Sequence, residues 1–246
     1  MEIYEPAEDS QLLAAAVKKY AYGSVLDMGT GNGIQAITAA KNKEIKSVVA
    51  VDANDEALKL AAAAATKEAN AVAAKIKFTK SDLFSGISAR ERFDTIIFNP
   101  PYLPQDKGIS DETIYGGKKG HETLHRFISS CCCYLKADGI ILIVFSSRTN
   151  KQKVDGIIEA NCLEFEELQQ KHIFFETLYA YLIRKSQLLL QLQQRGIKNV
   201  ELFEKGNRGL IYKGSYKGKT VAVKAKRKES AAVATIENEI NWLKKL

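Results

Sequence analysis

Hydrophobic positions along the first 185 residues alternate between two patterns. Short runs of β-branched and other apolar residues, typical of buried strands, are separated by segments whose apolar residues recur every three or four positions, as in helices. In residues 8–20, for example, Leu12, Leu13, Ala16 and Val17 share one helical face. The expected strands are 24–28, 47–51, 75–80, 93–98, 139–145, 165–170 and 176–184, and the expected helices are 8–20, 34–41, 54–69, 122–135 and 151–160.

This alternation of strands and helices predicts an α/β fold, with a mainly parallel sheet and helices on both of its faces. The continuous apolar strand 139–145 suits the middle of such a sheet, because a strand covered on both faces needs no polar side. The last two strands, 165–170 and 176–184, are expected to form an antiparallel pair. We therefore expect seven strands, with the last two inserted as a hairpin.

Residues 186–246 differ from the rest of the chain in charge. They carry 13 Lys and Arg against 5 Asp and Glu, whereas residues 1–185 carry 23 against 24. So sharp a shift predicts two domains, 1–185 and 186–246, with different roles. The basic excess could attract nucleic acid, although lysine-rich surface strands are often only solvated. An amphipathic helix over 186–195 is expected to begin the second domain.

The composition excludes several other classes of protein. No apolar run approaches the roughly 20 residues that cross a membrane. The acidic N-terminus lacks the basic and then apolar order of a signal peptide, so we expect a cytoplasmic protein without a membrane partner. Of the four cysteines, Cys131, Cys132 and Cys133 are consecutive, and no C-x-x-C pair exists. No metal site is expected from this spacing.

A glycine-rich turn follows the first expected strand. Gly29, Gly31 and Gly33 come directly after a strand that ends near Asp27, and a helix follows them. Glycine has no Cβ, so the backbone can approach a ligand closely at these positions. The spacing Gly-x-Gly-x-Gly differs from the Gly-x-Gly-x-x-Gly of dinucleotide-binding folds. This turn therefore predicts a site for a nucleoside cofactor.

Two acidic residues stand at the ends of the next two expected strands. Asp52 ends the second strand, where a carboxylate can accept hydrogen bonds from both ribose hydroxyls. Asp82 follows the third strand and can meet an adenine amino group, with Leu83 beside it. The alternative is a generic α/β turn with two acids that cap helices. Three features at successive strand ends favour the nucleoside site.

Asn99, Pro100, Pro101 and Tyr102 follow the apolar strand 93–98. The Asn99 side-chain oxygen and the Pro100 carbonyl can each accept one proton of a planar NH2 group, and the prolines fix the direction of that carbonyl. Tyr102 can stack on the planar group. Two acceptors favour positive charge on the nitrogen during methyl transfer, and in-line positioning contributes the rest of the rate. With the nucleoside site, this motif predicts an S-adenosyl-L-methionine-dependent methyltransferase.

Together these motifs resemble the HemK/PrmC family of protein-glutamine N5-methyltransferases, and most closely its short archaeal and eukaryotic branch. Tyr4-Glu5-Pro6-Ala7-Glu8-Asp9-Ser10 matches the opening signature of that branch, and Gly116-Gly117-x-x-Gly120-x-Glu122 with Arg126-Phe127 is a second matching segment. The resemblance covers about residues 3–185. It implies a class I, Rossmann-like methyltransferase domain in which Asn99 to Tyr102 hold the substrate glutamine. It also implies cofactor contacts from Ser10, Asp27, Gly29, Asp52, Asp82, Leu83 and Asn99.

The resemblance further implies partners. The family's usual target is the glutamine of the Gly-Gly-Gln loop in class-1 translation release factors. Members of this branch generally work with a small zinc-binding activator protein that pairs strands with the methyltransferase sheet.

Two other functions stay open at this point. Adenine-N6 methyltransferases of DNA or RNA use similar Asn-Pro-Pro-Tyr motifs, but they usually need a region that grips and flips the base. Residues 1–185 have no such insertion and no net basic charge, although the basic tail could supply grip. The chain could also be a catalytically silent binding platform, against which the intact Asp52, Asp82 and Asn99 argue.

The second domain contains a glycine-bearing hairpin with Gly206 and Gly209, a strand 219–224 ending in Lys224, and Glu239 on an expected helix 236–246. This order resembles the opening of a protein kinase, closest to small archaeal kinases of the Bud32 and Rio type. The match is incomplete, because no His-Arg-Asp or Asp-Phe-Gly motif is present. We expect no kinase activity from this chain. The alternative is a basic hairpin-helix appendage.

Overall fold

The computed structural model describes residues 7–103, 116–117, 120–206, 209–225 and 242–243. Two compact units make up the chain. Unit 1 comprises Met1–Ile157 and Phe165–Arg184, and unit 2 comprises Ile158–Glu164 and Lys185–Leu246. The first three residues of the opening signature, residues 4–6, and the candidate Glu239 lie outside the described residues.

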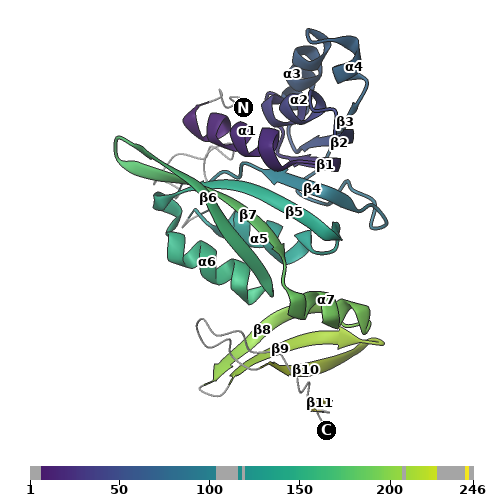
Figure 1. Cartoon of the computed structure of the whole chain (residues 1–246), viewed down its shortest axis with the longest axis vertical. Coiled ribbons are helices and arrows are strands. Elements are labelled where there is room, and N and C mark those ends of the chain that lie inside the picture. The colour runs from purple at the N-terminus through teal and green to yellow at the C-terminus, as the bar shows by residue number, and fades with distance from the viewer. Residues whose placement is uncertain (1–6, 104–115, 118–119, 207–208, 226–241, 244–246) are drawn as a thin grey trace. The chain divides into compact units, whose positions relative to one another are not determined.

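Unit 1 is built on a seven-stranded sheet with the order β3-β2-β1-β4-β5-β7-β6 (Figure 1). Neighbouring strands from β3 to β5 pair in parallel, and β5 pairs with β7 in the antiparallel direction. This confirms the expected Rossmann-like, mostly parallel sheet. The strands are β1 (Gly23–Met28), β2 (Ile45–Asp52), β3 (Ile76–Lys80), β4 (Phe93–Phe98), β5 (Leu135–Ser146), β6 (Leu163–Ile173) and β7 (Glu176–Lys185).

Helices cover both faces of this sheet. On one face, α1 and α2 pack against alternate residues of the central strands, among them Val25 and Ile97. On the other face, α5 places the Phe127 ring 4.6 Å from the ring of Phe98. Ile97 and Phe98 serve opposite cores because successive strand residues point to opposite faces. The helices are α1 (Glu8–Tyr20), α2 (Ile34–Ala40), α3 (Asp55–Thr66), α4 (Asn70–Ala73), α5 (Glu122–Cys131) and α6 (Lys151–Ala160).

Several local signals explain where these elements begin and end. Asn54 caps the start of α3, because its side-chain oxygen accepts a hydrogen bond from the Glu56 backbone nitrogen at 3.0 Å. The helix expected over 122–135 was wrong at its end. It stops at Cys131, because Leu135 pairs with Phe93 as the first residue of β5. Pairing with a distant strand overrides the local helical pattern there.

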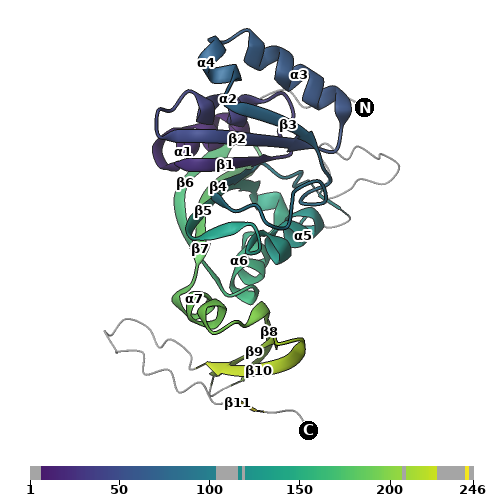
Figure 2. The ribbon, with the colours of Figure 1, turned by 90° about the vertical axis from the view of Figure 1, so that its right-hand side faces the viewer.

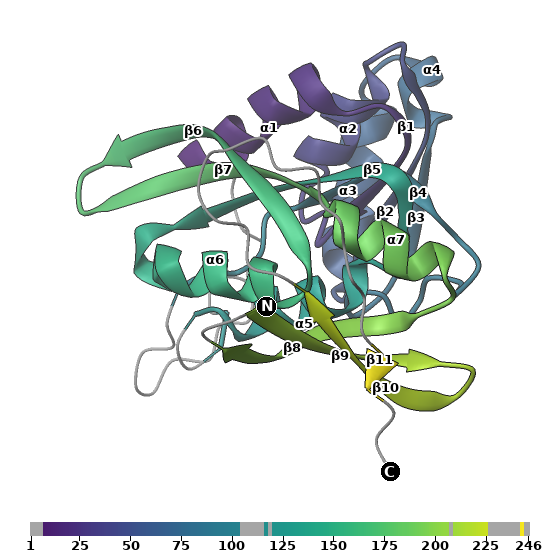
Figure 3. The same cartoon turned by 60° about the horizontal axis from the view of Figure 1, so that its bottom comes forward.

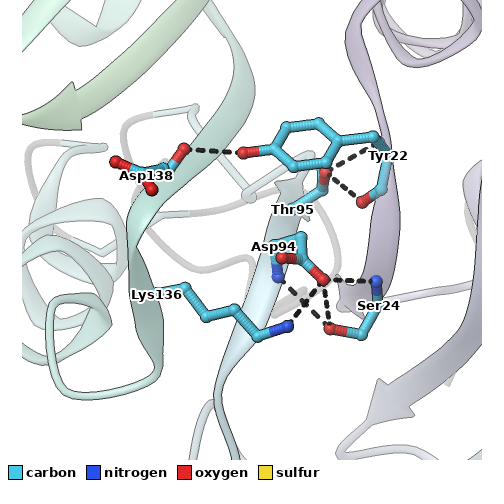
Figure 4. Close-up of polar contacts among 6 residues, drawn as sticks. All are labelled: Tyr22, Ser24, Asp94, Thr95, Lys136 and Asp138. Carbon is cyan, nitrogen blue, oxygen red and sulfur yellow. Dashed lines mark hydrogen bonds and ion pairs between the residues drawn. The ribbon is translucent and has the colours of Figure 1, made fainter.

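Polar contacts hold the starts of β1, β4 and β5 together (Figure 4). Asp94 Oδ2 accepts hydrogen bonds at 2.8 Å from the Ser24 backbone nitrogen, the Ser24 hydroxyl and Lys136 Nζ. The Tyr22 hydroxyl donates to the Asp138 carbonyl at 2.6 Å. Burial opposes ionisation of Asp94, but the hydrogen bonds from Lys136 and Ser24 outweigh it and lower the pKa of Asp94. These contacts set β1 beside β4, so that their carboxyl ends meet at the opposite edge of the sheet.

Unit 2 carries a four-stranded sheet with the order β11-β10-β9-β8, and its described neighbours pair in the antiparallel direction. The helix expected over 186–195 is confirmed as α7, whose first turn is capped by the Ser186 hydroxyl accepting from the Leu189 backbone nitrogen at 3.1 Å. The helix expected over 236–246 is wrong at Trp242–Leu243, which pair with β10, and its other residues lie outside the described part. The elements are α7 (Gln187–Gln194), β8 (Lys198–Gly206), β9 (Gly209–Tyr216), β10 (Lys219–Ala225) and β11 (Trp242–Leu243).

Candidate active site

The glycine-rich turn joins β1 to α2 at the place where the strand order changes direction (Figure 2). Such switch points of parallel sheets are where ligands bind. Gly29, Gly31 and Gly33 have φ angles of 62°, 56° and 87°, which a side chain would strain. A Cβ on Gly33 would lie 3.0 Å from the Ala61 side chain, whereas a Cβ on Gly31 would meet nothing within 4 Å. Gly33 therefore serves packing, and Gly31 leaves room for a ligand against the backbone.

Two carboxyl groups hold this turn. Asp27 Oδ2 accepts hydrogen bonds from the Thr30 hydroxyl at 2.6 Å and the Ala36 backbone nitrogen at 3.0 Å. Burial raises the pKa of Asp27 to about 7, against the lowering effect of these two hydrogen bonds. Asp52 Oδ2 accepts from the Gly31 backbone nitrogen at 2.9 Å. The structure therefore brings Asp27, Asp52 and the glycines together, as their positions at strand ends suggested.

Asn99 directly follows β4 and makes its polar contacts with α1. Its Nδ2 donates to Asp9 Oδ2 at 3.1 Å, and the Ser10 hydroxyl oxygen lies 3.5 Å away. The Tyr102 hydroxyl donates to the same Asp9 oxygen at 3.1 Å. Asn99 Oδ1 is buried and has no hydrogen-bond partner among the described residues. A buried acceptor without a partner is costly in a folded protein, which marks this oxygen as one that a ligand would satisfy.

Asp9 and Gln35 were not among the site residues expected from the sequence. Asp9 is 2% exposed although it carries a carboxyl group. Gln35 Nε2 donates to the Ser10 carbonyl at 2.9 Å and joins the start of α1 to α2. The only sequence signal for Asp9 was its place in the opening signature beside Ser10. Gln35 gave a weaker signal, as a long polar side chain in a helix made mostly of alanine and isoleucine.

The loop after β4 is held from two sides. Gly116, in the second matching segment, donates its backbone N–H to the Leu103 carbonyl at 3.0 Å. A Cβ on Gly116 would lie 2.4 Å from the Pro101 carbonyl oxygen, so only glycine allows this approach. The Thr149 hydroxyl, just beyond β5, donates to the Tyr102 carbonyl at 3.0 Å. These contacts give the Asn-Pro-Pro-Tyr backbone a defined direction.

Asp82 and Leu83 follow β3 at the same edge of the sheet. Asp82 Oδ2 accepts a hydrogen bond from Arg126 Nη2 on α5 at 2.9 Å, and both side chains are largely exposed. Leu83 adopts a left-handed backbone conformation with φ of 49°. The role of these two residues toward an adenine ring stays a prediction. Arg126 was expected only as part of a matching segment, and its contact with Asp82 was not foreseen.

The kinase-like candidates belong to unit 2. Gly206 and Gly209 are opposite each other at the turn between β8 and β9, and Lys224 lies on β10 opposite Ile211. Within the described ranges, no group of three or more His, Cys, Asp or Glu side chains is arranged to hold a metal ion. None of the described helices is both long and apolar enough to cross a membrane.

Comparisons with known proteins place the chain in a family. The family model of the methyltransferase small domain matches residues 6–175. A putative protein N5-glutamine methyltransferase of Methanocaldococcus jannaschii is 41% identical over 182 residues, which cover 72% of this chain and 89% of that protein. Methyltransferase HEMK2 of Homo sapiens is 28% identical over 198 residues, covering 75% of this chain and 91% of that protein.

Solved structures show the same fold. The Mtq2–Trm112 complex of E. cuniculi, described as responsible for the methylation of the eRF1 translation termination factor, aligns with a TM-score of 0.59 and 28% identity over 76% of this chain and 100% of that chain. The ribosomal protein L11 methylase of Lactobacillus delbrueckii subsp. bulgaricus aligns with a TM-score of 0.54 and 22% identity, over 74% of this chain and 82% of that chain. The second likeness concerns the fold alone.

The fold and the site define a class I methyltransferase that uses S-adenosylmethionine. The chain belongs to the methyltransferase small domain family and, within it, to the protein N5-glutamine methyltransferases. The HemK-type resemblance of residues 3–185 is thereby confirmed. The kinase-like resemblance of the second domain is not confirmed. The match to the methyltransferase family ends at residue 175, before α7 begins, so it does not reach that domain.

Proposed function

We propose that this protein methylates the side-chain nitrogen of a glutamine in the Gly-Gly-Gln loop of a class-1 translation release factor. The observation that carries the proposal is the buried, unpartnered Asn99 Oδ1 beside Tyr102. It is an acceptor placed where a carboxamide N–H could reach it. The E. cuniculi relative, whose described role is methylation of eRF1, supports the choice of substrate. A release-factor substrate would place the reaction in the cytoplasm, where translation ends.

The cofactor fits the residues at the glycine turn. S-adenosylmethionine, when bound, supplies a methyl group that its sulfonium makes electrophilic. Gly29 and Gly31 would let the backbone lie against it, since nothing stands within 4 Å of a Cβ on Gly31. Asp52 would accept hydrogen bonds from its ribose hydroxyls, and the buried Asp27 would favour its positive charge. Asp82, Leu83 and Ser10 would complete the pocket.

The substrate amide needs orientation more than it needs a base. Its nitrogen lone pair is delocalised into the carbonyl, so the site must favour positive charge on nitrogen as the new bond to the methyl carbon forms and the bond from that carbon to sulfur breaks. The nitrogen would then release one of its two protons to solvent, which leaves a neutral N-methyl amide. Asn99 Oδ1 and the Pro100 carbonyl would each accept one of the two N–H protons. Asp9 accepts from Asn99 Nδ2, which polarises the Asn99 amide and makes Oδ1 a better acceptor. Tyr102 would cover the flat carboxamide.

The proposal is tested by incubating a release factor with the protein and S-adenosylmethionine, followed by mass spectrometry of the release factor. We expect one added methyl group, on the glutamine of the Gly-Gly-Gln loop. Asn99→Ala should abolish it, and replacing that glutamine by asparagine in the substrate should do the same. Oligonucleotides with accessible adenines run in parallel. Methylation of the oligonucleotides instead of the release factor would identify the protein as an adenine-N6 methyltransferase. The absence of saturable cofactor binding would indicate a catalytically silent binding platform.

We also propose that a small zinc-binding partner of the Trm112 type pairs with β3. Among the strands that the structure describes, β3 is the last of the seven-stranded sheet and pairs with β2 alone. An exposed sheet edge offers backbone groups to an added strand. The neighbouring α3 presents Leu60, which is 49% exposed. Leu60→Asp should therefore weaken co-elution with such a partner, whereas the exposed Lys59→Asp, on the same helix, should weaken it less.

For unit 2 we propose a kinase-like N-lobe that transfers no phosphate. The order of elements in unit 2 supports this proposal. Three antiparallel strands follow one another, with a glycine-bearing turn between the first two and Lys224 on the third. The sequence holds no His-Arg-Asp base and no Asp-Phe-Gly metal ligand, so phosphoryl transfer lacks its machinery. Incubation with labelled ATP should leave both the chain and its substrate unlabelled.

A further inference from the structure

The β6–β7 hairpin ends in two adjacent phenylalanines that face solvent. The side chains of Phe174 and Phe175 are 103% and 92% exposed, whereas Phe203, the next most exposed large hydrophobic side chain among the described residues, is 63% exposed. Their ring centroids lie 6.5 Å apart, so the two rings form one apolar surface. A tight turn favours Gly, Asn or Asp, and two exposed aromatic rings do nothing for its conformation. Folding of the hairpin therefore does not explain this pair.

The residues around the pair hold the hairpin tip in place. Ile173 packs against the core formed by α1, α2 and the sheet. The Thr177 backbone nitrogen donates to the Ser147 hydroxyl at 3.0 Å, and the Ser146 hydroxyl donates to the Glu176 carboxyl group. An open hollow of about 420 Å³ lies beside the rings, and the two phenylalanines line it together with Ser147, His172, Ile173, Glu176 and Thr177. The phenylalanines are thus presented on a fixed support.

The hairpin tip lies on the active-site side of the sheet. Ser146 ends β5 opposite Leu178 of β7. Phe175 is three residues beyond Leu178, so the tip projects about 10 Å past the carboxyl edge of the sheet, and Figure 3 shows the hairpin reaching beyond its neighbours. The segment after β5 also contacts the catalytic loop, because the Thr149 hydroxyl donates to the Tyr102 carbonyl. One short segment therefore supports both the hairpin tip and the Asn-Pro-Pro-Tyr motif.

We propose that Phe174 and Phe175 dock the body of the protein substrate, outside the loop that carries the methylated glutamine. The inference rests on the proposed function. A glutamine that reaches Asn99 belongs to a protein whose surface must cover this edge of the sheet. Aromatic side chains are the usual energetic centres of such interfaces, and the hollow beside them offers room for a projecting side chain. Docking here would hold the substrate while its loop enters the site.

The strand order favours the substrate over the small partner as the occupant. The hairpin forms the β6 end of the sheet, whereas the edge proposed for the zinc-binding partner is β3, at the other end of the seven strands. The two proteins would then bind the sheet without competing. A second copy of this chain could also cover the two rings, and the experiment below distinguishes self-association from substrate docking.

The test compares two substrates. The double variant Phe174→Ser/Phe175→Ser and the control Phe203→Ser, which removes an exposed ring in unit 2, are assayed with S-adenosylmethionine and the Trm112-type partner. One substrate is the intact release factor, and the other is a short peptide with the same Gly-Gly-Gln loop. For the double variant we expect KM for the intact protein to rise at least tenfold with kcat within twofold. Peptide kinetics and cofactor Kd should be unchanged, and Phe203→Ser should match the wild type on both substrates.

Each other result overturns the inference. An unchanged KM for the intact protein would falsify docking at the hairpin. An equal loss on the peptide would mean that the rings support the catalytic loop. Loss of a wild-type dimer on sedimentation, with unchanged kinetics on the release factor, would assign the rings to self-association. If the wild type methylates neither substrate, the proposed function fails and takes this inference with it. That failure is distinct from a defect confined to the double variant.

Discussion

Asp9 Oδ2 lies 3.1 Å from Asn99 Nδ2, across a gap of ninety residues in the sequence. A carboxylate oxygen only accepts hydrogen bonds, so the nitrogen of the Asn99 amide faces Asp9 and its oxygen faces away. Oδ1 is then the buried acceptor left for a substrate. The same Asp9 oxygen also accepts from the Tyr102 hydroxyl at 3.1 Å. One carboxyl group thereby orients both side chains of the Asn-Pro-Pro-Tyr motif.

Asp9→Asn tests this orienting role. The variant offers an N–H as well as an oxygen, so Asn99 can turn its oxygen toward residue 9 and its nitrogen toward the substrate. We expect kcat to fall about 10- to 100-fold, the equivalent of losing one strong hydrogen bond of about 1–3 kcal/mol. Cofactor Kd should change less than threefold. Glu8→Gln, an exposed neighbour, is the control, and an equal effect there would contradict the role of Asp9.

Patterns that depend on neighbouring residues were readable from the sequence. The strand 93–98 and the helix 151–160 were predicted with the boundaries of β4 and α6, because apolar periodicity decides both. The helix 122–135 failed where the partner strand decides, since Leu135 pairs with Phe93. Such pairing joins residues about forty positions apart, so the pattern of neighbouring residues cannot predict it.

The candidate site divides in the same way. Gly31 and Asp52 were predictable, because parallel strands end at one edge and Asp52 Oδ2 accepts from the Gly31 nitrogen. The contacts of Asp9 with Asn99 and of Asp82 with Arg126 were not. Both depend on how helices α1 and α5 are placed over the sheet. That placement follows from side-chain packing and not from the spacing of a motif.

Asp27 should make cofactor binding depend on pH. Burial raises its pKa to about 7, so in the ligand-free protein it gains its negative charge near neutrality. S-adenosylmethionine carries positive charge, and an ionised Asp27 should favour it. We expect the cofactor Kd, measured by calorimetry, to fall several-fold between pH 6 and pH 8. Asp27→Asn should bind more weakly and with a flatter pH profile, and an unchanged slope in that variant would rule out Asp27 as the group responsible.

The same carboxyl group should make the ligand-free protein less stable as pH rises. The folded state keeps a proton on Asp27 up to about pH 7, whereas the unfolded chain releases it near pH 3.8. Between these values the native state binds more protons, so the free energy of unfolding falls by up to about 1.4 kcal/mol per pH unit from this group. Urea unfolding at pH 5 and pH 7 should show the fall in the wild type and a smaller fall in Asp27→Asn.

Two glycine substitutions should separate stability from binding. A Cβ on Gly23 would lie 2.3 Å from Asp94 Oδ2, and its φ is 67°. Gly23→Ala should therefore cost about 2–4 kcal/mol of stability and leave cofactor Kd within twofold. Gly31→Ala meets nothing within 4 Å, so its backbone strain should cost only about 1–2 kcal/mol while cofactor Kd rises at least tenfold. A cofactor Kd in Gly31→Ala that stays within twofold of the wild type, as in Gly23→Ala, would show that the Gly31 turn does not contact the cofactor.

Asp94 should affect stability with the opposite dependence on pH. Its pKa is lowered because hydrogen bonds from Lys136 and Ser24 outweigh the effect of burial. A carboxyl group with a lowered pKa stabilises the folded state above its unfolded value near pH 4, and that stabilisation disappears as pH falls through the folded value. Since Lys136 is 45% exposed, we expect Asp94→Asn to cost only about 1 kcal/mol at pH 7. The difference from wild type in urea unfolding should shrink toward pH 3. A difference that persists or grows there would mean that Asp94 acts by packing and not by charge.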